Sequence, residues 1–188
     1  MQNEIKSMIN ESIETKRLCE TLAPQIEEAT SLVVKALKSN KKIILAGNGG
    51  SATQAGHIAG EFTGRYRLER KALPAIALTT DLAAITAISN DYGFDKVFER
   101  QLEALANEGD VFIALSTSGN SKNLIKAAEA AKKLNVNVIG LLGKDGGKMK
   151  SISKVEIIVP SGNTPRIQEA HLMILHIICE LVEKELFG

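Results

Sequence analysis

The sequence predicts an α/β fold in which helices cover both faces of a five-stranded, doubly wound parallel sheet. Two observations predict it. Short, nearly continuous apolar segments recur along the chain, as expected of parallel strands buried on both faces. Helical patterns separate these segments, and such alternation implies right-handed crossovers and a three-layer arrangement. A length of 188 residues fits one domain, so we expect residues 1–188 to fold as a single unit.

The first 39 residues are predicted to form two helices that precede the sheet. An apolar stripe at helical spacing marks the first helix: Ile5, Met8, Ile9 and Ile13. Pro24, a favoured first-turn residue, opens a second apolar pattern that runs to Leu37. Because no strand separates the two helices, residues 1–39 form a helical extension that is a candidate for contact with another copy of the chain.

Strands and helices then alternate to the end of the chain. The strands are predicted at 41–46, 75–78, 111–115, 136–141 and 155–159, and the helices at 52–64, 82–89, 95–107, 121–134 and 164–186. The last helix is apolar nearly all round from Leu172 to Val182. A helix of that kind is buried on every side, so we expect another subunit to cover its outer face.

The composition excludes several classes of protein. The formal net charge is +1, and the chain has five Phe, two Tyr and no Trp, which argues against a nucleic-acid partner. Residues 1–17 lack the apolar core of a signal peptide, and no apolar run approaches the roughly 20 residues of a membrane span. Cys19 and Cys179 fit neither a disulfide framework nor a metal site and are expected to be small buried side chains. We therefore expect a cytoplasmic protein.

Two loops stand where predicted strands pass into predicted helices. Gly47–Ser51 is rich in glycine, which lets backbone N–H groups approach a ligand at a helix N-terminus. Ser116–Ser121 presents four hydroxyls and an amide in the same setting, which suits a phosphate monoester or a polyol. Open parallel sheets bind ligands at this edge.

A dinucleotide site is the alternative interpretation of the first loop. Gly47, Gly49 and Ala52 satisfy the G-x-G-x-x-A pattern. That pattern also requires an acidic residue about 20 positions further on. The acidic residue at the tip of the second predicted strand is Asp81, 34 residues after Gly47, so the nucleotide interpretation is disfavoured.

All three histidines lie on two predicted helices. His57 and Glu61 are four residues apart and share one helix face. On the last helix, Gln168 is three residues from His171 and eight from His176, so spacing favours His171 as its partner. Two histidines, a carboxylate and an amide would suit zinc, although the same spacings occur on ordinary helices and a histidine in an apolar segment is more often part of the core. Alternatively, a Glu and a His facing a sugar phosphate form a general base and a general acid.

Five segments together resemble the bacterial phosphoheptose isomerases. They are GNGGSATQAGHIAGEFTGRY at 47–66, NDYGF at 90–94, STSGNS at 116–121, GKDGGKM at 143–149 and RIQEAHLMILH at 166–176. The resemblance runs in order over nearly the whole chain, including the two leading helices. Any one segment alone would indicate only the wider sugar-isomerase (SIS) domain class.

The resemblance implies a homotetrameric SIS domain, with flavodoxin-like strand order, that converts sedoheptulose 7-phosphate into D-glycero-D-manno-heptose 7-phosphate. That reaction is the first step towards the activated heptoses of lipopolysaccharide core or other surface glycans. The resemblance also implies one zinc ion per site. By motif matching the ligands fall on His57, Glu61, Gln168 and His176, which replaces His171 by the second histidine.

The same resemblance implies roles in an enediol pathway, with Glu61 as the base and His176 as the acid. The implied substrate contacts are Asn48, Gly49, Gly50, Ser51, Glu61, Arg65, Asn90, Asp91, Ser116, Thr117, Ser118, Ser121 and Gln168. A glutamate that binds zinc is a poorer base, so the two roles of Glu61 conflict unless its coordination changes during turnover.

Two non-catalytic alternatives remain open. Some relatives in the SIS class are binding proteins, such as the factor that associates with the replication initiator in some bacteria, and that factor lacks the glutamate corresponding to Glu61. A sugar-phosphate sensor would keep the hydroxyl-rich loop and would need no Glu/His pair. Glu61, four residues after His57, favours the enzyme.

Overall fold

The computed structural model of the chain describes residues 1–188. Its centre is a sheet in which every neighbouring pair of strands is parallel and the strand order is β2-β1-β3-β4-β5. The strands are β1 (Ile43–Gly47), β2 (Ala75–Ala77), β3 (Val111–Ser116), β4 (Asn137–Gly143) and β5 (Val155–Val159). The predicted five-stranded parallel sheet and its flavodoxin-like order are confirmed.

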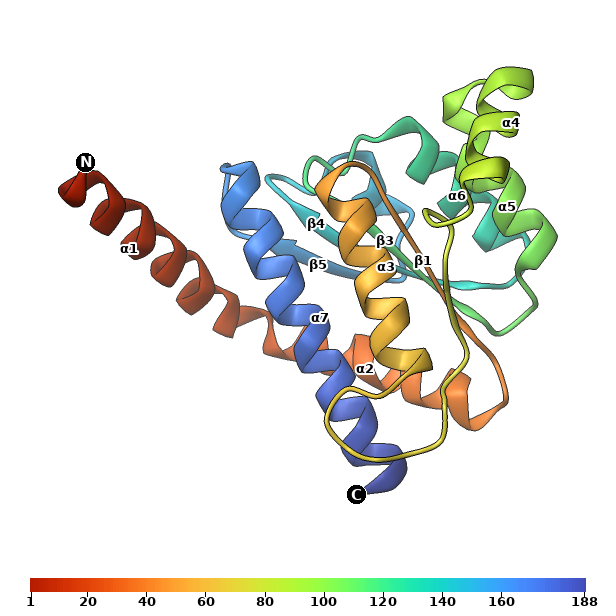
Figure 1. Cartoon of the computed structure of the whole chain (residues 1–188), viewed down its shortest axis with the longest axis horizontal. Helices are drawn as coiled ribbons and strands as arrows, with labels where there is room; N and C mark the ends of the chain where they lie inside the picture. The colour runs from red at the N-terminus through yellow and green to blue at the C-terminus, as the bar shows by residue number, and fades with distance from the viewer.

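Helices cover both faces of the sheet (Figure 1). One layer consists of α2 (Ala23–Lys38), α3 (Gly50–Thr63) and α7 (Thr164–Phe187). The opposite layer consists of α5 (Val97–Leu105) and α6 (Lys122–Lys133), and α4 (Leu82–Tyr92) packs against α5. Three short 3-10 helices, which the sequence patterns did not indicate, are η1 (Cys19–Leu22), η2 (Phe94–Lys96) and η3 (Gly147–Ser151).

Each helical layer packs on the sheet through its own hydrophobic cluster. The side chains of β1 alternate between the two clusters: Ile43 and Leu45 pack with α2, α3 and α7, whereas Ile44 and Ala46 pack with α5 and α6. All four are fully buried. Burial of both faces of the sheet explains why its central strands are apolar at successive positions.

The connections change direction between β1 and β3. The chain leaves β1 through α3 for β2 on one side, and it then returns through α4 and α5 to β3 on the other side. Gly47 at the end of β1 pairs with Leu115 near the end of β3, so the loops that follow these strands emerge side by side. A crevice at such a reversal is where open α/β sheets bind ligands.

The two N-terminal helices differ in their surroundings. Helix α2 belongs to the helical layer, where Ile26, Ala29 and Val33 join the same cluster as α7. Helix α1 (Gln2–Leu18) extends away from the body of the molecule (Figure 1) and buries only Thr15. Its predicted apolar stripe is therefore exposed in a single chain: Ile5, Met8, Ile9 and Ile13.

Two other helices also present apolar side chains to the outside. Helix α7 is not buried on all sides within one chain, because Ile177 is 37% exposed. Helix α4 has no buried residue at all, and the exposed side chains on it and just after it include Leu82, Tyr92 and Phe94.

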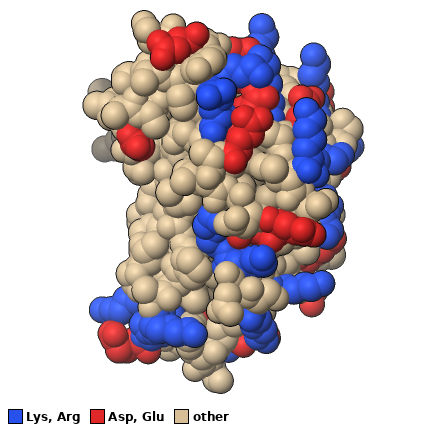
Figure 2. Space-filling model, turned by 90° about the vertical axis from the view of Figure 1, so that its right-hand side faces the viewer, with Lys and Arg blue, Asp and Glu red and all other residues tan.

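The surface charge agrees with the near-neutral composition. Charges of both signs are interspersed on the face that Figure 2 shows, with no continuous basic patch. None of the helices is both long enough and apolar enough to cross a membrane. Both cysteines are buried and unpaired, as predicted.

Candidate active site

The first loop of the site, the glycine loop Gly47–Ser51, connects β1 to α3. Gly49 has a φ of +56°, a left-handed conformation that glycine adopts without the steric penalty of a Cβ. The first turn of α3 follows at once, and the N–H of Ser51 donates to the carbonyl of Asn48. Ser51 is buried. The predicted contacts Asn48, Gly49 and Gly50 thus lie at a helix N-terminus, whose partial positive charge favours an anion.

The second loop, the hydroxyl loop Ser116–Ser121, connects β3 to α6. The Oγ of buried Ser116 lies 3.2 Å from the Oγ of Ser121. Ser121 is the N-cap residue of α6, but its side chain makes no capping hydrogen bond. Thr117 and Ser118 are half-buried between them. The structure therefore gathers hydroxyl donors at a second helix N-terminus, an arrangement able to bind a phosphate group.

A pair of asparagines joins the two loops. The Nδ2 of Asn48 donates to the Oδ1 of Asn123 over 3.0 Å, and the Nδ2 of Asn123 donates back to the Oδ1 of Asn48 over 2.8 Å. Asn123 is buried in the first turn of α6. It was not among the predicted site residues, because the local sequence does not distinguish it from other polar residues at the start of a helix.

The segment after β4 supports the hydroxyl loop. Gly119 has a φ of +63°, and a Cβ at this position would lie 1.9 Å from the carbonyl oxygen of Gly146. The Oδ1 of Asn120 accepts the N–H of Lys148 over 3.1 Å, and the carbonyl of Gly119 accepts the N–H of Met149 over 3.0 Å. The backbones of the two segments are in contact, so side chains larger than glycine would not fit between them. This contact explains the glycines of the GKDGGKM segment.

A cluster of titratable side chains lies between α3 and α7. The Nε2 atoms of His57 and His176 are 3.0 Å apart, and the Oε1 of Glu61 is 3.4 Å from the Nε2 of His57. One ligand atom from each of the three residues lies within 4.8 Å of the others. The cluster is open to solvent, since the side chain of His57 is 48% exposed and that of Glu61 is 22% exposed.

The geometry of this cluster fits a divalent metal as well as proton transfer. Two Nε2 atoms this close can share one hydrogen, or both can direct lone pairs at one cation. Ligands about 2.0–2.1 Å from a tetrahedral zinc ion lie about 3.3 Å from one another. The separations of 3.0 and 3.4 Å are close to that value. Burial lowers the pKa of His176 and nearby His57 lowers it further, while Glu61 acts in the opposite direction.

The other two candidates on α7 make different contacts. His171 is fully buried, and its Nε2 donates to the carbonyl of Leu142 over 2.9 Å. Burial lowers the pKa of His171 to about 4, although this hydrogen bond opposes the change. The preference for His171 that spacing suggested was therefore wrong: His171 belongs to the core, and His176 reaches the cluster. The amide of Gln168 lies against the glycine loop, where a Cβ on Gly50 would be 2.9 Å from its Nε2.

Three predicted substrate contacts are exposed at the surface of the single chain. Arg65 is exposed in the loop after α3, with its Nε 3.6 Å from the Oε2 of Glu69. Asn90 and Asp91 are exposed at the end of α4, where the amide of Asn90 donates to the carboxylate of Asp91. Because α4 packs in the layer opposite to α3 and α7, one chain does not bring Asn90 and Asp91 to the cluster.

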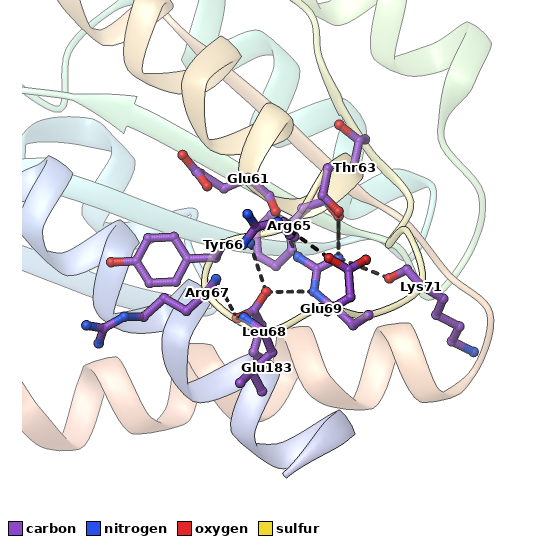
Figure 3. A network of polar contacts seen from close by, with 12 residues as sticks. Glu61, Thr63, Arg65, Tyr66, Arg67, Leu68, Glu69, Lys71 and Glu183 are labelled. Atoms are coloured by element: carbon purple, nitrogen blue, oxygen red, sulfur yellow. Dashed lines mark hydrogen bonds and ion pairs between the residues drawn. The ribbon is translucent and has the colours of Figure 1, made fainter.

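The loop that follows α3 wraps around the carboxylate of Glu183, which belongs to a buried ion pair (Figure 3). The side chains of Arg70 and Glu183 are 1% and 2% exposed, and the Nε of Arg70 donates to the Oε1 of Glu183 over 2.7 Å. The carboxylate also accepts the N–H groups of Tyr66, Arg67 and Leu68, each over 2.9 Å. Burial alone would raise the pKa of Glu183, but these donors outweigh it and hold the pKa at about 2. Neither Arg70 nor Glu183 was predicted, because nothing local pairs residues so far apart in sequence.

Comparisons with known proteins identify the family of the chain. The SIS domain family profile matches residues 9–143. A phosphoheptose isomerase from Sulfurimonas denitrificans is 51% identical, over 100% of this chain and 98% of that protein. A phosphoheptose isomerase from Citrifermentans bemidjiense is 54% identical, over 98% of this chain and 96% of that protein.

Solved structures show the same fold. A phosphoheptose isomerase from Neisseria gonorrhoeae superposes with a TM-score of 0.93 at 43% identity, over 97% of this chain and 98% of that one. A second, from Francisella tularensis, gives a TM-score of 0.94 at 37% identity with the same coverage. With about half of its residues identical to these relatives over its full length, the chain belongs to the phosphoheptose isomerase family of SIS-domain proteins.

Proposed function

We propose that this protein is a cytoplasmic isomerase that converts sedoheptulose 7-phosphate into D-glycero-D-manno-heptose 7-phosphate. One observation carries the proposal: the carboxylate of Glu61 and the imidazoles of His57 and His176 converge between α3 and α7. A carboxylate base and an imidazole acid whose ligand atoms lie within 4.8 Å of one another suit the transfer of a proton between adjacent carbons. Similarity to proteins named phosphoheptose isomerase supports the same reaction. A sensor or docking protein would not need such a pair.

The phosphate of the substrate would bind in the hydroxyl loop. Ser116 and Ser121 lie together there, and the N-terminus of α6 adds partial positive charge. We propose that Thr117 and Ser118 contribute to the same contact, and that Asn48 and Gln168 contact the sugar from the glycine loop side. Binding at a remote phosphate orients the reacting end of a long open-chain sugar and so lowers the barrier to reaction.

The proton transfers would take place at the other end of the sugar. Glu61 removes a proton from C1 of the ketose while His176 gives a proton to the carbonyl oxygen O2, and an enediol forms. Glu61 then returns its proton to C2 while His176 takes the proton of the O1 hydroxyl, and C1 becomes the aldehyde. His176 thus moves one proton between O1 and O2. The substrate and the product have the same composition, because each proton that is removed is returned.

The same side chains would hold a zinc ion. We propose His57, Glu61 and His176 as ligands, on the strength of their separations, and Gln168 as the fourth, because it matches the family's motif. When bound, the ion would polarise the sugar oxygens and keep the side chains in register. A carboxylate has two oxygens, so Glu61 can serve as a ligand through one and accept a proton through the other.

We further propose that a homotetramer completes the site. Helices α1 and α4 expose apolar side chains, and exposed apolar surface of this kind marks contacts between proteins. A pocket of the single chain lies between α2 and α7, and none of the cluster residues lines it. Asn90 and Asp91, on the opposite layer from their own cluster, would contact the substrate held by a neighbouring copy.

The direct test is turnover of sedoheptulose 7-phosphate by the purified protein, followed by proton NMR. We expect aldose signals to appear, to stop after treatment with a chelator, and to return when zinc is added. The product would supply the activated heptoses of lipopolysaccharide core or other surface glycans. Binding of the sugar phosphate by zinc-loaded protein without any conversion would contradict the proposal and support a sensor.

A further inference from the structure

The end of α3 is fixed by a group that the proposed proton transfers do not use. The guanidinium of Arg70 donates to the carbonyl oxygens of Glu61 over 2.8 Å and of Phe62 over 2.9 Å. These carbonyls belong to the last turn of α3, where backbone acceptors have no partner within the helix. Arg70 therefore caps the helical turn that carries the Glu61 side chain.

The partner of Arg70 fixes a second side chain of the cluster. Glu183 accepts the N–H of Tyr66, and the Tyr66 ring stacks on the imidazole of His176 with centroids 5.4 Å apart and an interplanar angle of 26°. His57 meets the same imidazole edge-on, with centroids 5.3 Å apart and an angle of 73°. The His176 ring is thus held between Tyr66 and His57.

The buried ion pair of Arg70 and Glu183 is better suited to holding the backbone in place than to stabilising the fold. Desolvation offsets most of the attraction in a buried ion pair, so such a pair is a weak source of net stability. This pair instead holds the backbone in place. The carboxylate of Glu183 binds the loop that leaves α3 (Figure 3), and the guanidinium of Arg70 binds the last turn of α3. The last turn of α3 carries Glu61, which belongs to the cluster, and the loop carries Tyr66, which contacts His176.

We propose that Arg70 and Glu183 are positioning residues of the isomerase, Arg70 by fixing Glu61 through the end of α3 and Glu183 by seating Tyr66 against His176. The inference rests on the proposed function for its effect on turnover. It also predicts an effect on metal binding, which can be measured without the sugar.

The test compares Glu183→Gln with Glu180→Gln. Glu180 is a matched control on the same helix, because it is partly exposed and pairs only with the side chains of Arg67 and Lys184. Glu183→Gln should lower kcat by about 10- to 100-fold, as removal of a group that supports metal ligands does, and should leave KM nearly unchanged. Titration of the metal-free protein with Co²⁺, followed by visible absorption, should show a similar loss of affinity. Glu180→Gln should match the unmodified protein in both measurements.

Tyr66 provides a second pair of variants that does not disturb the ion pair. Tyr66→Phe keeps the stacked ring and should keep kcat, whereas Tyr66→Leu should lower kcat and Co²⁺ affinity by about tenfold. If Glu183→Gln does not fold, the two Tyr66 variants still test whether the contact of Tyr66 with His176 supports turnover and metal binding. Unchanged kcat and Co²⁺ affinity in Tyr66→Leu, or in folded Glu183→Gln, would overturn the inference. Failure of the unmodified protein to isomerise would overturn the proposed function instead and leave the Co²⁺ comparison standing.

Discussion

The hydroxyl loop and the His57–Glu61–His176 cluster are held in place by different kinds of contact. The hydroxyl loop rests on several neutral hydrogen bonds: Gly119 and Asn120 bond to the segment after β4, and Asn123, just after the loop, bonds to Asn48 of the glycine loop. The cluster rests on one buried ion pair between residues 113 positions apart in the chain. Several separate contacts therefore hold the loop, whereas a single ion pair holds the segments around the cluster.

This difference has a consequence for mutation. Loss of one neutral hydrogen bond typically lowers stability by about 1 kcal/mol, and the remaining bonds keep the loop in place. Loss of one partner from a buried ion pair leaves an uncompensated charge in the interior. Substitutions around the cluster should therefore have larger effects than substitutions around the loop.

The largest effect on stability is expected from Arg70→Met. This change leaves the Glu183 carboxylate buried without its cation, and the free energy of unfolding should fall by about 3–5 kcal/mol. Arg65→Met is the matched control, because Arg65 is exposed and faces Glu69 at the surface. We expect the control to change stability by about 0.5 kcal/mol or less. Urea denaturation measures both, and equal small losses would show that support for the cluster is not concentrated in this pair.

The next effect concerns α7, the helix that carries His176 of the cluster. Burial lowers the pKa of His171 from 6.5 to about 4, so the unfolded chain binds a proton there before the folded one does. The stability that this difference contributes is fully present above pH 6.5 and is lost as the pH falls towards about 4. It amounts to about 3 kcal/mol.

His171→Leu removes this titration. The variant loses the hydrogen bond to Leu142 at every pH, so its curve of unfolding free energy against pH should be lower at neutral pH but flatter between about 7 and about 4. Urea denaturation over that range measures the slope. Identical slopes for the two proteins would show that His171 does not titrate as its burial implies.

The smallest effect is expected in the loop region, from Asn123→Ala. Two hydrogen bonds to Asn48 are lost, which at about 0.5–1.5 kcal/mol each should raise KM for the sugar phosphate by about tenfold and change kcat little. Asn107→Ala, at an exposed site before β3, is the control and should leave both constants unchanged. A larger fall in kcat than rise in KM would contradict distributed support for the loop.

Short-range signals made much of the fold predictable. Ile43–Gly47 and Val111–Ser116 are apolar runs that end where glycine or serine begins a loop, and such runs depend only on neighbouring residues. The same is true of the spacing that places His57 and Glu61 on one helix face. Those two loops and this face of α3 were therefore found from the sequence.

Long-range contacts were not predictable from one sequence. Spacing along α7 pointed to His171. Spacing alone cannot show that the side chain of His171 faces the carbonyl of Leu142 in β4. The resemblance to a family, rather than any local pattern, selected His176. Arg70 and Glu183 gave no signal, since a charged residue that will be buried by a distant partner looks like any surface charge until the chain folds.

The most direct test of the proposed proton transfer compares the turnover of Glu61→Gln with that of Glu69→Gln. In the proposed reaction the carboxylate of Glu61 moves the proton between C1 and C2, whereas Glu69 is an exposed carboxylate in the following loop. Glu61→Gln should lower kcat for sedoheptulose 7-phosphate by at least about 100-fold, the low end of a general-base contribution, and Glu69→Gln should retain full activity. Full activity in Glu61→Gln would show that Glu61 is not the base.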